Sequence, residues 1–235
     1  MKIDRTKNAG RNIVFGCMLK IYQIVMPFIM RTLMIYYMGI QYLGLNSLFT
    51  SILQVLNLAE LGVGSAMVYS MYKPIAVDDK KMICALMKLY RTYYRVIGII
   101  IAFLGLCLVP FIPKLIKSDV PADINIYVLY ILNLSVTVLS YWLFAYKNCL
   151  LDAHQRTDVA SKVTLVTNTL QYIVQFFTLC FLKNYYAYII VSLAAQALTN
   201  ILTAVVTTHM YPDYRPDGNL SKEVISGINR RIRDL

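Results

Sequence analysis

The stretch YYAYIIVSLAAQALTNILTAVVTTHM, Tyr185–Met210, contains no Asp, Glu, Lys or Arg. About 20 mainly apolar residues are enough for a helix to cross the hydrocarbon core of a bilayer. Inside lipid, every backbone N–H and C=O group must be satisfied within the segment, so the stretch is expected to be helical. It therefore predicts a transmembrane helix, and the rest of the chain repeats its pattern.

Five further segments have the same character. They are Asn12–Met38, Leu43–Tyr69, Tyr94–Ile116, Ile124–Tyr146 and Val159–Leu182. The composition agrees, because 58% of the residues are hydrophobic, only 15% are charged and the mean hydropathy is +0.57. A soluble domain usually has about a quarter of its residues charged. The sequence predicts an all-α integral membrane protein, with a six-helix transmembrane bundle over residues 12–210.

The charged residues give this bundle an orientation. The net charge is +11, and most Lys and Arg lie in the tail 1–11, in the loops after the second and fourth segments, and in the tail 211–235. The alternate loops hold only Lys114, Lys117 and Lys183. Because cytoplasmic loops carry the excess of Lys and Arg, both termini are predicted to be cytoplasmic.

A charged segment between the second and third apolar segments is predicted to be a separate helix at the membrane surface, over about residues 78–93. Asp78 or Asp79 would cap its start. Apolar residues then recur at steps of three and four, as expected of an amphipathic interfacial helix.

Several classes of function are disfavoured. The five cysteines show no C-x-x-C spacing and there are two histidines, so neither a metal site nor a disulfide framework is expected. No basic patch is interleaved with aromatic residues outside the apolar segments, which argues against nucleic-acid binding. Catalytic groupings of His, Asp or Glu are not evident, since Asp78 and Asp79 are better explained as helix caps. No cofactor and no enzymatic activity are expected.

Polar residues form stripes on the first two apolar segments. On a helix of about 100° per residue, one face of the first carries Lys20, Gln23, Pro27 and Arg31. One face of the second carries Asn46, Thr50, Gln54, Asn57, Glu60 and Gly64. Such stripes can join packed helices or line a hydrated cavity. For these two segments we favour a cavity, because ionisable residues are costly in lipid and usually face an interior path.

Glu60 is the carboxylate within the run LNLAELGVGSA, Leu56–Ala66. At 1.5 Å per residue, Glu60 and Lys20 each lie about 14 Å from the basic end of their segment. We therefore predict an ion pair between Lys20 and Glu60. Arg31 would remain unpaired, giving a cavity of net positive charge that suits an anionic ligand, since a guanidinium fits phosphate oxygens.

The run RTLMIYYMGIQYLGLNSLFTSILQVLNLAELGVGSAMVYSMYKPIAVDDKKMICALMKLYR, from Arg31, resembles the N-terminal region of bacterial polysaccharide exporters of the flippase type, in the multidrug/oligosaccharidyl-lipid/polysaccharide superfamily. The matching features are Arg31 ahead of a G-x-x-Y-x-G-L turn starting at Gly39, then LAELGVGSA, then the block Tyr72–Asp79. The later run LLDAHQRTDVASK, which ends at Lys162, is also similar.

The resemblance implies a transporter that moves undecaprenyl-diphosphate-linked oligosaccharides across the bacterial cytoplasmic membrane by alternating access. It implies two six-helix lobes around a cationic cavity, with polysaccharide polymerase or glycosyltransferase machinery as possible partners beside membrane lipids. The candidate cavity residues in this chain are Arg31, Lys20, Asn46, Gln54, Asn57 and Glu60. The family has twelve or fourteen spans, so six spans would correspond to an N-terminal lobe, with 211–235 as a linker towards a second lobe.

Three alternatives remain open. An ion-coupled exporter of small molecules in the same superfamily would be expected to bury more carboxylates than Glu60 alone. A non-transporting component of a polysaccharide assembly complex would fit a half-length chain. A membrane glycosyltransferase would need a grouping of acidic residues that the sequence does not show.

Overall fold

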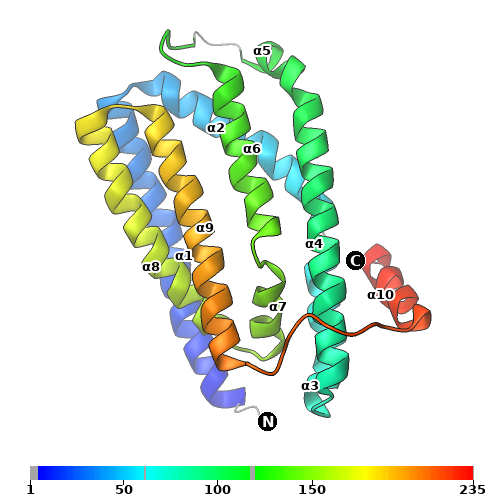
Figure 1. Ribbon diagram of the computed structural model, residues 1–235. Coiled ribbons are helices and arrows are strands. Elements are labelled where there is room, and N and C mark those ends of the chain that lie inside the picture. Colours follow the sequence, from blue (N-terminus) through cyan, green and yellow to red (C-terminus); the bar gives the residue numbers. More distant parts are fainter. Residues whose placement is uncertain (1–4, 61, 117–119, 235) are drawn as a thin grey trace.

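The computed structural model describes residues 5–60, 62–116 and 120–234, and within them all regular structure is helical (Figure 1). The elements in chain order are α1 (Arg5–Tyr37), α2 (Ile40–Leu56), η1 (Asn57–Glu60), α3 (Val63–Ala76), α4 (Lys80–Leu108), η2 (Val109–Phe111), α5 (Ile112–Leu115), α6 (Ile126–Trp142), α7 (Tyr146–Ala153), α8 (Thr157–Phe177), η3 (Thr178–Leu182), α9 (Tyr185–Met210) and α10 (Lys222–Asp234).

Four stretches of helix in the described chain are long and apolar enough to cross a membrane. They are Asn8–Tyr37, Lys80–Leu115, Thr157–Leu182 and Tyr185–Met210. The bent pair of α6 and α7 makes a fifth if it counts as one span. The chain is thus an all-helical, multi-pass membrane protein. The last predicted segment is confirmed, since α9 covers the same residues.

The second predicted segment is not one helix. α2 ends at Leu56, the short turn η1 follows, and α3 begins only at Val63. Gly62, just before α3, has a φ of 82°, a left-handed conformation that glycine adopts without a Cβ clash. With 17 residues, α2 falls short of the length of a typical span. The prediction of an unbroken helix over Leu43–Tyr69 is therefore wrong.

The fourth predicted segment is also interrupted. α6 ends at Trp142, Phe144 has a φ of 59°, and α7 leaves at an angle of 50° to α6. A left-handed residue cannot continue a right-handed helix, so the break is built into the backbone at this position. Both broken helices face the same interior region, which places irregular backbone beside the cavity described below.

The separate surface helix predicted over about 78–93 is the first half of α4 instead. The cap prediction is confirmed for Asp79, whose side chain accepts a hydrogen bond of 3.0 Å from the backbone N–H of Met82. The apolar face of this half-helix, including Ile83, Leu86 and Tyr90, is buried against the protein and does not face lipid. The burial of that face allows α4 to continue straight into its apolar half.

α4 and α6 approach each other closely at two glycines. A Cβ on Gly98 would lie 2.3 Å from Nε1 of Trp142, and a Cβ on Gly105 would lie 2.5 Å from Cδ1 of Leu134. Small residues permit such close packing where there is no hydrophobic drive between helices in lipid.

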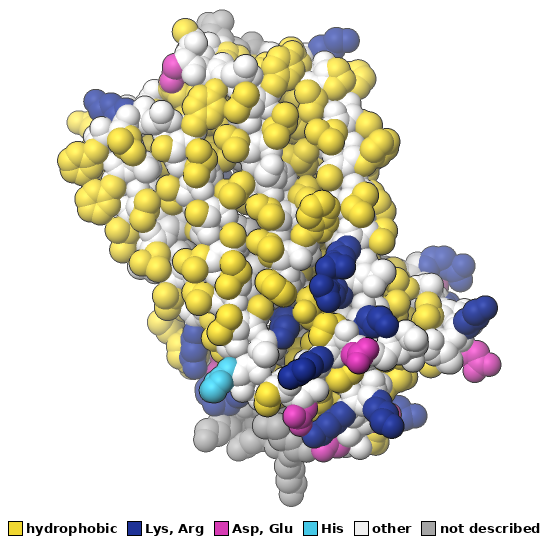
Figure 2. Space-filling view, in the orientation of Figure 1, with side chains coloured by type: hydrophobic (Ala, Val, Ile, Leu, Met, Phe, Trp, Pro, Cys, Tyr) yellow, Lys and Arg dark blue, Asp and Glu magenta, His cyan; other side chains and the backbone are white. Residues whose placement is uncertain are grey.

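The charges separate along the length of the bundle. In the orientation of Figure 2, apolar side chains cover the upper part, and most Lys and Arg visible on this face gather at the lower end. The chain after α9 crosses the start of α4 at that end and seats α10 beside α3 (Figure 1). We call the lower region the basic end, and the segment from Tyr211 to Asp234 the strap.

Candidate functional site: a polar cavity at the helix breaks

A cavity of about 730 Å³ lies next to the two helix breaks. Its walls come from η1, α3, α4, α6, α7 and α9. The described residues that line it are Glu60, Gly64, Ser65, Val68, Tyr69, Tyr72, Tyr94, Ser140, Tyr141, Ala145, Asn148, Cys149, Asp152, Gln196 and Asn200. This lining includes two carboxylates, four phenols and three amides, and neither Lys nor Arg.

Glu60 lies at the end of η1 and is half-buried. The hydroxyl of Tyr94 on α4 donates a hydrogen bond to Oε1 of Glu60. The hydroxyl of Tyr141 on α6 donates to Oδ1 of Asn57 at 3.2 Å, and the two tyrosine rings stack with centroids 5.8 Å apart. Two phenol hydroxyls thus bind the broken segment to α4 and α6. They provide hydrogen-bond partners for the side chains of Glu60 and Asn57, which lie inside the bundle.

The second carboxylate comes from α7. Asp152 is half-buried, and on the preceding turn the Sγ of Cys149 lies 2.6 Å from the hydroxyl of Tyr90. Opposite, α9 contributes Gln196, which donates to Oδ1 of Asn200 at 3.2 Å. Carboxylates, amides and aromatic rings accept hydrogen bonds from hydroxyl-rich ligands and can also hold a cation. The described residues include no group of three or more His, Cys, Asp and Glu placed to hold a metal ion.

The structure brings only part of the predicted site together. Glu60 lines the cavity, and Asn57 is bonded to a lining residue. Lys20 and Arg31 are exposed on α1, and Gln54 is exposed on α2. Asn46 is half-buried on α2 and does not line the cavity.

The predicted Lys20–Glu60 ion pair does not appear among the ion pairs of the described residues, where Glu60 is bonded to Tyr94. The reason is the packing of α1, which lies along α8 and contributes no residue to the cavity wall. The hydroxyl of Tyr22 on α1, for example, lies 2.9 Å from Oγ1 of Thr169 on α8. The cavity inside this bundle is therefore acidic, whereas the sequence predicts a cationic one.

Sequence reasoning missed Asp152, Tyr94 and Tyr141. Asp152 lies in the run LLDAHQRTDVASK, which is singled out above only for its resemblance. The signal that could have found it is an acidic residue next to an apolar segment. Asp152 lines the same cavity as Glu60 because α7 bends away from α6, and this bend cannot be recognised from local sequence.

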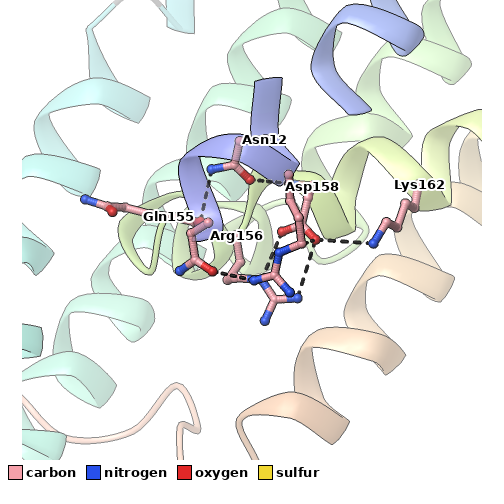
Figure 3. Close-up of polar contacts among 7 residues, drawn as sticks. Asn12, Gln155, Arg156, Asp158 and Lys162 are labelled. Atoms are coloured by element: carbon pink, nitrogen blue, oxygen red, sulfur yellow. Dashed lines mark hydrogen bonds and ion pairs between the residues drawn. The ribbon is translucent and has the colours of Figure 1, made fainter. Parts of the chain in front are cut away.

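A second polar cluster lies at the basic end and is separate from the cavity (Figure 3). Its centre is Asp158, whose side chain is fully buried. Arg156 lies 2.9 Å from one carboxylate oxygen, and Lys162 lies 3.4 Å from the other. A carboxylate buried this deeply needs such partners, because an unpaired buried charge costs several kcal/mol.

The same cluster ties α1 to the turn between α7 and α8. Asn12 accepts a hydrogen bond of 2.9 Å from the backbone N–H of Asp158, and its amide donates to the carbonyl oxygen of Gln155 at 3.0 Å (Figure 3). The Nε of Arg11 lies 4.0 Å from the Asp158 carboxylate. Asn12 and Arg11 thus fix the start of α1 against the turn before α8, while Arg156 and Lys162 neutralise Asp158 locally.

Comparisons of the chain with protein-family models, with curated proteins and with solved structures found no match.

Proposed function

We propose that the chain forms one lobe of a membrane transporter of the flippase type, which moves undecaprenyl-diphosphate-linked oligosaccharides across the bacterial cytoplasmic membrane. On this proposal the chain crosses six times, with α2–η1–α3 and α6–α7 as broken crossings and both termini in the cytoplasm. Broken helices at membrane depth are tolerated where they are buried in protein or line a water-filled cavity, and transporters use them for this purpose.

The observation that carries the proposal is the exposure of Lys20 and Arg31 on α1. Only 6% of the apolar window of α1 is buried within the bundle, so this helix has little protein cover. Two cations at membrane depth on a lipid-facing surface would be costly. The face is better explained as the wall of a hydrated passage, completed by a second lobe or a second copy of the chain.

Other polar groups extend this face. Thr50 and Gln54 are exposed on α2, which packs against α1 and passes behind α6 in Figure 1. Cations on α1 suit the diphosphate of a lipid-linked sugar, since Arg offers planar donors to phosphate oxygens. The acidic, tyrosine-rich cavity inside the lobe suits the hydroxyl groups of the glycan. The two surfaces together match a ligand with an anionic and a neutral, hydroxylated part.

The test is a flipping assay in proteoliposomes that contain the protein and a fluorescent polyprenyl-diphosphate oligosaccharide. We expect the rate at which the fluorophore becomes protected from a membrane-impermeant quencher to fall about tenfold or more in Arg31→Gln, because one phosphate contact is worth about 1.5–3 kcal/mol. Arg233→Gln, a change on the exposed face of α10, is the matched control. Equal rates for wild type and Arg31→Gln would refute the role of α1.

A second candidate, an ion-coupled exporter, gains support from one observation. Glu60 and Asp152 line the same cavity without a neighbouring Lys or Arg in its wall. Such a pair of carboxylates can carry Na⁺ or protons. Uptake of a cationic dye that requires an imposed ion gradient and is lost in Asp152→Asn would favour this candidate over the flippase.

A further inference from the structure

The strap ends in a helix that is too polar and too short to be stable alone. α10 has 13 residues, and isolated helices of this length are marginal in water. Val224, Ile228 and Ile232 recur at every fourth position and form one apolar stripe, with the half-buried Ile225 beside it. Ile228 is 3% exposed, and Val224 and Ile232 pack against the same core cluster. The helical state of α10 therefore depends on its docking against the bundle. A small number of side-chain contacts holds it there.

These contacts hold α10 to α3 and α4. Arg231 lies over the ring of Tyr69, with its guanidinium carbon 4.7 Å from the centroid, and its Nη1 donates to Oγ of Ser70 at 3.3 Å. Tyr93 on α4 donates a hydrogen bond to Oδ1 of Asn229. The helix thus bridges the outer face of α3 and the middle of α4.

The rest of the strap is fastened to the start of α4. Nζ of Lys80 lies 2.6 Å from the carboxylate of Asp213, and Nζ of Lys88 donates to the side chain of Asn219 at 2.9 Å. Gly218, with a φ of 90°, passes so close to Ala85 that an added Cβ would lie 3.4 Å from its methyl group. The strap therefore stays anchored on α4 even when α10 leaves α3.

α3 lies between the polar cavity and the groove under α10. It follows the left-handed Gly62, and its residues Tyr69 and Tyr72 line both the polar cavity and the groove of about 600 Å³ under α10. The ring on which Arg231 stacks is thus also part of the cavity wall. Movement of α3 about the break before Val63 would shift both tyrosines.

We propose that α10 is a latch that holds α3 against α4 and so limits access to the polar cavity from the basic end. Docked, α10 keeps Tyr69 in place through Arg231 and seats Ile228 between α3 and α4. Released, it frees α3 to swing about Gly62 and opens the cavity. This role needs only the cavity and the strap, so it stands or falls independently of the transported molecule.

The test measures thiol access to the cavity. In the full chain with Cys17, Cys84, Cys107 and Cys180 replaced by alanine, the native Cys149 is the one remaining thiol, and with α10 docked it is buried in the cavity wall. The readout is the rate of labelling by a charged, membrane-impermeant maleimide. Arg231→Ala removes the link to α3, and Ile228→Asp removes the apolar seat, without changing any residue that lines the cavity.

We expect both variants to raise the labelling rate about tenfold, because α10 contributes one cation–π contact and one buried aliphatic side chain to its docking. Arg231→Lys keeps the charge, loses the planar stacking and should give an intermediate rate. Arg233→Ala on the exposed face should label like the parent. Tryptic cleavage within α10 reports its release independently.

Two results would overturn the latch. In the first, trypsin cuts α10 faster in Arg231→Ala or Ile228→Asp while the labelling rate stays at that of the parent. In the second, neither variant changes cleavage or labelling, which would mean that the contacts described do not hold the helix. A failure of flipping with normal latch behaviour would count against the proposed function alone.

Discussion

The hydroxyl of Tyr94 donates a hydrogen bond to the carboxylate of Glu60, so residues of α4 and of the break after α2 meet at the wall of the polar cavity. This contact explains how a carboxylate persists inside an apolar run. The charge is stabilised by a phenol hydroxyl from a neighbouring helix, and the predicted Lys20 is not its partner.

Tyr94→Phe removes the donor and leaves the half-buried carboxylate without this bond. We expect a loss of about 1–3 kcal/mol of unfolding free energy, the usual cost of an unsatisfied buried polar group. Thermal unfolding of the purified protein in detergent measures it. Tyr127→Phe, at an exposed position on α6, is the control and should unfold like wild type. Identical midpoints for all three proteins would contradict the stabilising role.

Asp158→Asn keeps the shape of the buried side chain and removes its charge. Arg156, Lys162 and Arg11 would then repel one another around a neutral amide, and breaking a buried pair of this kind costs about 3–5 kcal/mol. We expect a lower unfolding midpoint and faster proteolysis near the start of α1. Asp234→Asn, on the exposed face of α10, should change neither. A stable Asp158→Asn protein would show that the cluster does not hold α1 to α8.

Gly98→Ala and Gly105→Ala test the close packing of α4 on α6. Each added methyl would overlap a side chain of α6, Trp142 or Leu134, and overpacking of this kind costs about 1–3 kcal/mol. Gly16→Ala on α1 is the matched control, because an added Cβ there meets nothing within 4 Å. We expect the control to be neutral or up to about 1 kcal/mol more stable, since alanine is the better helix former. Equal losses at all three positions would exclude a packing effect.

We expect the stability of the protein to depend on pH through the buried His154. It is buried after α7, with its ring 4.4 Å from that of Tyr211 and its Nδ1 2.8 Å from the carbonyl oxygen of Leu150. Burial lowers the pKa of His154, while the hydrogen bond to Leu150 and the Asp78 carboxylate act in the opposite direction. The folded protein therefore favours the neutral ring.

The sign of the effect follows from this shift. The unfolded chain takes up a proton near pH 6.5, before the folded protein does, so protonation favours unfolding. The contribution of His154 is fully present above about pH 6.5 and is lost as the pH falls through that value towards the lowered folded pKa. We expect the unfolding midpoint to drop more between pH 7.5 and 5.5 in wild type than in His154→Gln. His209→Gln, at an exposed position, should behave like wild type.

Helix type and the long apolar segments could be predicted from the sequence because lipid leaves the backbone few alternatives. α9 agrees at both ends, and the stop after Met210 agrees with the prolines that follow. The breaks at Gly62 and Phe144 could not be predicted in this way, because the residues around both are apolar enough to continue a helix. Each break contains a left-handed residue, Gly62 before α3 and Phe144 after α6, and side chains from elsewhere in the fold contact the broken segments.

The candidate site was predicted less well, and the reason is geometric. Periodicity places Lys20, Arg31 and Glu60 on the inner faces of two straight helices. A break between α2 and α3 turns Glu60 towards α4 and leaves α1 with α8, so residues of equal depth do not share a cavity. Asp152 reaches the cavity only because α7 bends away from α6 by 50°.

The strap also sets an order of assembly during synthesis. Arg231 is made 161 residues after Ser70, its partner on α3. A ribosome adds residues one at a time, so the outer face of α3 stays uncovered while α4 to α9 are made and inserted. Docking of α10 is therefore the last step available to this part of the chain. Proteolytic cleavage of α3 would therefore be faster in bundles on which α10 has not yet docked than in bundles on which it has.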